Sequence, residues 1–117
     1  MFKNLTPHAI NILSDEKVTE TGNGKMLEFN EMTIEPSGTV ARCSVHRAQV
    51  ETIDRVVINK TVFGEVTGVP SPEKGVYLIV SSLVAQALVG RSDILIPDDT
   101  VRDNEGRIIG CRALARI

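Results

Sequence analysis

The sequence predicts an α+β domain that is rich in β-strands, with one short helix after a buried strand and a β-hairpin near the C-terminus. Apolar residues mostly recur with a period of two, and β-branched residues are abundant, as is typical of strands. The chain has 117 residues, of which 42% are hydrophobic and 24% are charged. This length and composition fit a single domain over residues 1–117, built around one hydrophobic core.

The N-terminal half is predicted to consist of strands joined by turns. Strands are expected over 9–13, 27–34 and 61–66, and an extended segment with imperfect alternation is expected over 39–53. Glycine and proline favour turns at 22–24 and 36–38, and Asp54 or Asn59 marks the bend that precedes the strand at 61–66.

The C-terminal half contains the predicted helix. Prolines and glycines make 68–75 a stiff, exposed connection. The continuous apolar run 76–80 is typical of a strand that is buried on both faces. Ser81 and Ser82 follow this strand and can cap a short helix over 83–88.

Two more strands and a hairpin complete the expected fold. Gly90 stops the helix, and 94–96 is a second buried strand, so that strand, helix and strand form a compact crossover or a helix-capped edge. The segments 100–102 and 107–112 flank the turn Asp103–Gly106, which predicts the C-terminal hairpin.

The charge balance and the terminal sequence exclude several classes of protein. There are 13 basic and 15 acidic residues, for a net charge of −2, so the basic excess of a general duplex-binding protein is missing. No apolar run approaches the roughly 18 to 20 residues that span a bilayer, and the N-terminus lacks the pattern of a secretory signal. We therefore expect a soluble, cytoplasmic protein with neither a membrane nor a nucleic-acid polymer as partner.

The sequence predicts neither a catalytic site nor a metal site. Cys43 and Cys111 are the only cysteines, and they are expected to be reduced and partly buried because they lack zinc-ligand spacing. His8 and His46 lie in different segments and suggest no pairing with a nucleophile. The acidic residues near the C-terminal turn do not have EF-hand spacing. We expect no enzymatic activity and no cofactor.

Arginine is concentrated at the C-terminal end of the chain. Five of the eight arginines lie in the last 27 residues, whereas all five lysines occur at or before Lys74. The five are Arg91, Arg102, Arg107, Arg112 and Arg116. Arginine suits a planar grip on phosphate or carboxylate, which favours a ligand. Local ion pairs with the nearby acidic residues explain the pattern equally well. These acidic residues are Asp93, Asp98, Asp99, Asp103 and Glu105.

The junction between the buried strand and the helix is a second candidate region. Ser81 and Ser82 precede a helix N-terminus, whose free N–H groups and dipole attract an anion such as phosphate. The alternative is that the serines only cap the helix. Tyr77 is the only tyrosine in a chain with 3% aromatic residues. Its ring suits stacking on a base or contact with a ribose, or else belongs to the core.

Four stretches of the sequence together span nearly the whole chain. They read NLTPHAINI at 4–12, PSGTVAR at 36–42 and YLIVSSLVAQAL at 77–88, followed by Arg91 to Asp103 and Gly106 to Cys111. In these stretches the sequence resembles small phage and prophage proteins, in particular the first family of Thoeris anti-defence proteins. No stretch is a catalytic signature.

The resemblance implies a molecular sponge rather than an enzyme. Members of that family bind the cyclic ADP-ribose isomer made by bacterial TIR-domain defence proteins and sequester it intact, and some also bind cyclic oligonucleotides of the CBASS system. They are homo-oligomers with ligand sites between protomers. On this basis the expected ligand contacts are Tyr77, Ser81, Ser82, Arg91, Arg102, Arg107 and Arg112. The alternative is a small oligomeric structural or assembly protein of a phage, with no nucleotide ligand.

Overall fold

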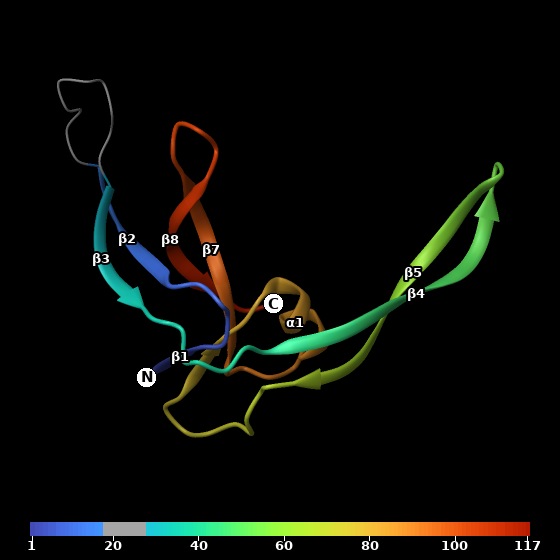
Figure 1. The fold of residues 1–117 in the computed structure, drawn as a ribbon, viewed down its shortest axis with the longest axis horizontal. Helices are drawn as coiled ribbons and strands as arrows, with labels where there is room; N and C mark the ends of the chain where they lie inside the picture. Colours follow the sequence, from blue (N-terminus) through green and yellow to red (C-terminus); the bar gives the residue numbers. More distant parts are fainter. Residues whose placement is uncertain (18–27) are drawn as a thin grey trace.

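The computed structural model describes residues 1–17 and 28–117, with side chains described for 1–13 and 32–117. Within these residues the fold is dominated by strands, with one short helix (Figure 1). In chain order the elements are β1 (Phe2–Asn4), β2 (Ile10–Lys17), β3 (Glu28–Ile34), β4 (Arg42–Ile53), β5 (Val56–Thr67), β6 (Tyr77–Ile79), α1 (Ser82–Ala87), β7 (Ile94–Arg102) and β8 (Ile108–Ala115).

Six strands form one mixed sheet in the order β1-β6-β7-β8-β2-β3, which we call the head together with α1. β1 pairs in parallel with β6, and β6 pairs in parallel with β7, with α1 between them in the sequence. The strands β7 and β8 form the antiparallel C-terminal hairpin. β8 meets β2 in parallel where Ile12 lies opposite Cys111, and β2 pairs with β3 in antiparallel orientation.

The core is split between the two faces of this sheet. On one face Leu78, Val80 and Ile94 pack with Val84 and Ala85 of α1. The other face contains a second cluster of buried residues, made of Ile10, Ile34, Ile79, Leu95 and Cys111. Successive side chains of a strand point to opposite faces, so β6 contributes to both clusters. This confirms the prediction of a strand that is buried on both sides.

The strands β4 and β5 form a separate two-stranded sheet, which we call the arm. In Figure 1 the arm points away from the head, and only its base lies near α1. At that base Cys43 and Val66 pack against the core. None of residues 42–67, all of which the structure describes, is buried. The radius of gyration is 18.0 Å, whereas a compact chain of this length has about 13 Å.

Most predicted elements are present, but several are longer than predicted. The helix begins one residue earlier than expected, and the side chain of Ser81 caps it by accepting a hydrogen bond from the N–H of Val84 (3.3 Å). β7 continues to Arg102 instead of ending at 96, so that it forms one strand of the C-terminal hairpin. The predicted turn at 22–24 lies outside the described residues.

Two parts of the N-terminal half differ from the prediction. The bend falls at Asp54, the first of the two positions expected for it, so the strand expected over 61–66 begins earlier, at Val56. The strand Phe2–Asn4 was not predicted, since it forms only by pairing with β6 far along the chain. None of the described helices is both long and apolar enough to cross a membrane.

Candidate functional site

Of the seven predicted ligand contacts, six lie near one or the other end of β7, and Arg112 lies between them on β8. Tyr77, Ser81 and Ser82 lie on β6 and at the start of α1, near the first residue of β7, whereas Arg102 ends β7 and Arg107 follows the turn. A strand rises about 3.3 Å per residue, so the nine residues of β7 separate these two groups by about 26 Å. Within one chain the two groups therefore do not share a single small-molecule pocket.

Arg91 holds two segments of its own chain together. Its Nε and Nη2 donate to the two carboxylate oxygens of Asp93, at 3.0 and 2.7 Å, and Nη2 also donates to the carbonyl of Pro70 at 3.0 Å. The side chains of Arg91 and Asp93 are 25% and 14% exposed. The hydrogen bonds from Arg91 lower the pKa of Asp93. This bidentate pair fixes the connection 68–75 to the start of β7.

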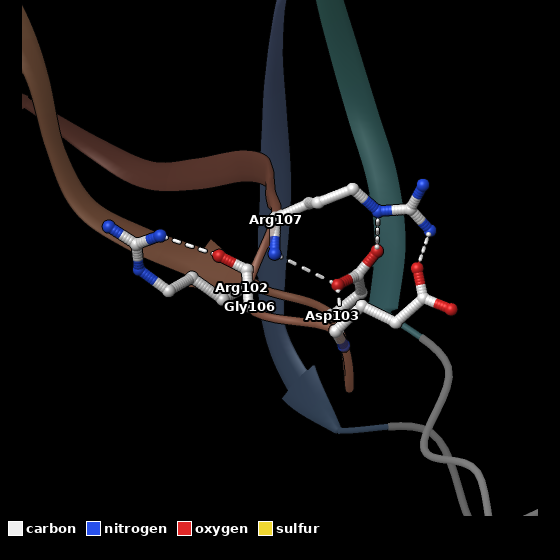
Figure 2. A network of polar contacts seen from close by, with 5 residues as sticks. Arg102, Asp103, Gly106 and Arg107 are labelled. Atoms are coloured by element: carbon white, nitrogen blue, oxygen red, sulfur yellow. Dashed lines mark hydrogen bonds and ion pairs between the residues drawn. The ribbon is translucent and has the colours of Figure 1, made fainter.

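The tip of the C-terminal hairpin is ordered by a second set of contacts, drawn in Figure 2. One carboxylate oxygen of Asp103 accepts from the backbone N–H groups of Glu105 (2.9 Å) and Arg107 (3.0 Å). The other accepts from Nε of Arg107 at 3.0 Å. These contacts lower the pKa of Asp103, mainly through the N–H of Arg107. Arg107 also pairs with Glu105 at 2.7 Å, and Arg102 donates to the carbonyl of Gly106 at 2.6 Å.

The predicted local ion pairs are confirmed for Arg91 and Arg107. Arg116 donates to the carbonyl of Ser92 at 2.8 Å, which joins the C-terminal residues to the start of β7. Arg112 lies on β8 and is partly buried. A ligand role for Arg91, Arg102, Arg107 or Arg112 stays a prediction, and all four already have a contact within their own chain.

In the structure, the two serines form the beginning of α1. Ser81 uses its hydroxyl for the N-cap, and Ser82 is the exposed first residue of a helix of six residues. A helix this short has a small dipole, and its first turn contains no acidic residue. Contact with a phosphate remains a prediction for Ser81 and Ser82.

Tyr77 forms an exposed ring pair with Phe2. The two residues lie opposite each other in the parallel pairing of β6 and β1, and their ring centroids are 6.1 Å apart with the planes tilted by 49°. Phe2 is 39% exposed and Tyr77 is 37% exposed. Tyr77 also lines a hollow of about 270 Å³, together with Lys74, Ser92 and Asp93. The N-terminal ammonium group donates to the carbonyl of Gly75 at 2.8 Å, beside this hollow.

Phe2 was not identified as a candidate from the sequence. Its position beside Tyr77 depends on strand pairing between residues that are far apart in the chain, which no local pattern shows. The sequence offered one signal, which is that the chain has only 3% aromatic residues. With so few rings, each of them could have been considered as a possible neighbour of Tyr77.

Several motif residues serve the fold instead of a ligand. Asn4 is 1% exposed and makes four hydrogen bonds through its side chain. Its Nδ2 donates to the carbonyls of His8 (2.7 Å) and Ile34 (3.0 Å), and its Oδ1 accepts from the N–H (2.9 Å) and hydroxyl (2.6 Å) of Thr6. The carbonyl of Asn4 accepts from the N–H of Ser37 at 2.9 Å. The stretches 4–12 and 36–42 therefore meet at one structural junction.

The described residues contain no group of three or more His, Cys, Asp or Glu side chains that could hold a metal ion. Cys111 is buried and Cys43 is partly buried, and both are free thiols. Burial raises the pKa of the Cys111 thiol, so it is a poor nucleophile at neutral pH.

Comparison with known proteins found no matching family, no similar curated protein and no similar solved structure.

Proposed function

We propose that the protein binds a cyclic nucleotide immune signal and sequesters it without degrading it. The observation that carries this proposal is the exposed pair of rings, Phe2 and Tyr77, beside a hollow that Lys74 borders. Exposed aromatic surface is unfavourable in water, and a planar base that covers such a ring contributes about 1 to 3 kcal/mol to binding. Lys74 supplies a cation for a phosphate of the same ligand, and of the two carboxylates that also line the hollow, Glu73 and Asp93, the second is paired with Arg91.

The ring pair alone contributes too little binding free energy for a protein that sequesters a signal. A protein that competes with a signalling receptor needs roughly nanomolar affinity, about −12 kcal/mol, which one stacked base does not provide. A second copy of the chain supplies further contacts if the ligand lies between protomers, as the sequence resemblance implies. The proposed protein is thus a homo-oligomer encoded by a phage or prophage, and it acts in the cytoplasm of the infected bacterial host.

Calorimetry with the cyclic ADP-ribose isomer tests this proposal. The purified protein is titrated with the ligand, then heat-denatured, and the released ligand is analysed by mass. We expect binding and release of the unchanged molecule. Absence of binding contradicts the proposal, and release of a cleaved product identifies an enzyme instead.

Two substitutions test the ring itself. Tyr77→Ala should weaken binding by about 5- to 100-fold, which corresponds to the loss of one stacking contact, while Tyr77→Phe keeps the ring and should bind nearly as well. Met32→Ala, which removes an exposed apolar side chain from β3, is the control and should leave binding unchanged. If Tyr77→Ala binds like the wild type, the ring pair is not the site.

A second candidate function is supported by the internal contacts of the arginines. Arg91 and Arg107 are engaged within their own chain, and the arm offers a large unburied surface. Both features fit a small oligomeric structural or assembly protein of a phage. That protein would bind no nucleotide in the calorimeter and would co-purify with phage particles.

A further inference from the structure

The arm has more exposed apolar surface than a free hairpin of its size can explain. A two-stranded hairpin is at best marginally stable in water and normally needs a third strand or a covering layer. Yet Val50, Ile53, Val56 and Val57 at the end of the arm are all at least half exposed. Within the described residues, neither outer edge of the arm pairs with another strand.

The surface area of the chain exceeds that of a compact monomer by enough to accommodate an interface of ordinary size. A compact monomer of 12.7 kDa exposes about 6,200 Å², whereas this chain exposes 8141 Å². A standard interface buries about 800 Å² on each partner. The excess is large enough for such an interface, and the arm contributes to it because none of its residues is buried.

The two outer edges of the arm differ in their capacity to accept another strand. β4 is interrupted at Val50, where an extra residue forms a bulge between the pairs Gln49 to Asn59 and Glu51 to Ile58. Bulges and charged residues protect edge strands from pairing. β5, by contrast, pairs without a bulge over 56–63, contains no proline there and has one charged residue, Lys60. Six of these eight residues are β-branched or aromatic, which favours a strand.

We infer that the β5 edge at 56–63 pairs with the same edge of a second copy of this chain. Antiparallel pairing about a two-fold axis joins two arms into a four-stranded sheet in the order β4-β5-β5-β4. The two faces continue from one copy to the other, so that apolar residues such as Ile58 and Val62 gain cross-strand neighbours. The interface also gives the arm the additional strands that an isolated two-stranded hairpin lacks.

This inference deepens the homo-oligomer of the proposed function, but its test uses no nucleotide. The arm interface can therefore be disproved while ligand binding is observed, and ligand binding can be absent while the arm interface is confirmed. The ring pair of Phe2 and Tyr77 lies on the head, so the arm interface is distinct from the contacts that a second copy makes to the ligand in the proposed function.

Two matched lysine substitutions provide the test. Val57 on β5 and Val50 on β4 are 52% and 55% exposed, so replacing either one disturbs the folded arm to a similar degree. Lysine on an edge strand opposes pairing, and a two-fold axis places it in the interface twice. We expect sedimentation analysis to show a wild-type dimer, a dissociation constant raised about tenfold or more in Val57→Lys, and little change in Val50→Lys. Circular dichroism confirms that both variants are folded.

Hydrogen exchange on the unmodified chain provides a second test that needs no variant. The amides of 56–63 that point away from β4 should become more protected as the protein concentration rises, and they should gain more protection than the outer-edge amides of β4. A chain that stays monomeric at roughly 100 µM overturns the inference. Equal dissociation by Val50→Lys and Val57→Lys, or concentration-dependent protection confined to β3 or β4, also overturns it.

Discussion

Asn4 is the residue on which the N-terminal junction depends. Replacing it with alanine removes the hydrogen bonds to the carbonyls of His8 and Ile34 and to the N–H of Thr6, of which the bond to Ile34 is buried. An unsatisfied buried polar group costs about 1 to 3 kcal/mol, so Asn4→Ala should destabilise the protein by about 2 to 4 kcal/mol, measured by urea unfolding. Thr6→Val removes only the hydroxyl contacts and should cost about 1 kcal/mol. Equal losses in the two variants would contradict this role for Asn4.

Asp93 should make stability depend on pH in the acid range. Hydrogen bonds from Arg91 hold the pKa of Asp93 below its ordinary value of about 3.9. The unfolded chain therefore takes up this proton at a higher pH than the folded chain does. The stabilisation is complete above about pH 4 to 5 and is lost as the pH falls through the lower folded pKa.

Asp93→Asn tests this dependence. At neutral pH the variant should be about 1 to 2 kcal/mol less stable, because Arg91 loses a bidentate partner, and the difference should shrink below about pH 4. Urea unfolding at a series of pH values measures it. Glu73→Gln, at an exposed carboxylate of the connection 68–75, is the control and should change the free energy of unfolding little at neutral pH. A constant difference in Asp93→Asn would show that its charge is not the cause.

At the scale of single elements, the turn of the arm is strained. Ile53 pairs with Val56, so a two-residue turn joins β4 to β5, and both of its residues have positive φ, 47° for Asp54 and 69° for Arg55. Such turns favour Asn-Gly, since a left-handed conformation costs other residues about 1 to 2 kcal/mol. Arg55→Gly should stabilise the arm by about 0.5 to 1 kcal/mol after the added entropy of the unfolded chain is deducted.

The gain from Arg55→Gly should appear as slower hydrogen exchange of the amides near the tip, because the arm can open without unfolding the head. Arg55→Ala is the control, since it removes the same side chain but keeps the strain. If both variants slow exchange equally, the arginine side chain, and not the backbone, is responsible.

The elements that the sequence predicted well have local signals. The buried run of β6, the serine cap of α1 and the Asp103–Gly106 turn are each marked by neighbouring residues. The strand β1 has no such signal, because it exists only through pairing with β6. The length of the arm was also missed, since its turn is Asp54-Arg55 and lacks the glycine that usually marks a tight hairpin.

In the candidate site, too, contacts between residues close in the sequence were predicted, and contacts between distant residues were not. Local ion pairing of the C-terminal arginines was one of two interpretations of the sequence, and it is confirmed for Arg91 with Asp93 and for Arg107 with Asp103 and Glu105, whose partners lie within four residues. The ring pair of Phe2 and Tyr77 requires two strands that are joined only in the folded head, so sequence reasoning identified one ring and missed the other.

At the scale of the whole molecule, the head should fold without the arm. No residue of the arm is buried. The contacts of the arm with the core are made at its base by Cys43 and Val66, and the pair of Val45 and Phe63 lies farther from the head. The register shows where to cut, because Val45 and Phe63 lie opposite each other. Residues 46–62 can thus be replaced by Asn-Gly, which closes a short hairpin at this pair.

We expect this shortened chain to unfold cooperatively, with a free energy within about 1 kcal/mol of the wild type, because the excised residues bury no core side chain. X-ray scattering should show a smaller radius of gyration than the full chain, and sedimentation should show a monomer if the β5 edge forms the dimer. Retention of the dimer would place the interface on the head. Loss of cooperative unfolding would instead show that the arm stabilises the head, since the excision leaves the contacts of Cys43 and Val66 in place.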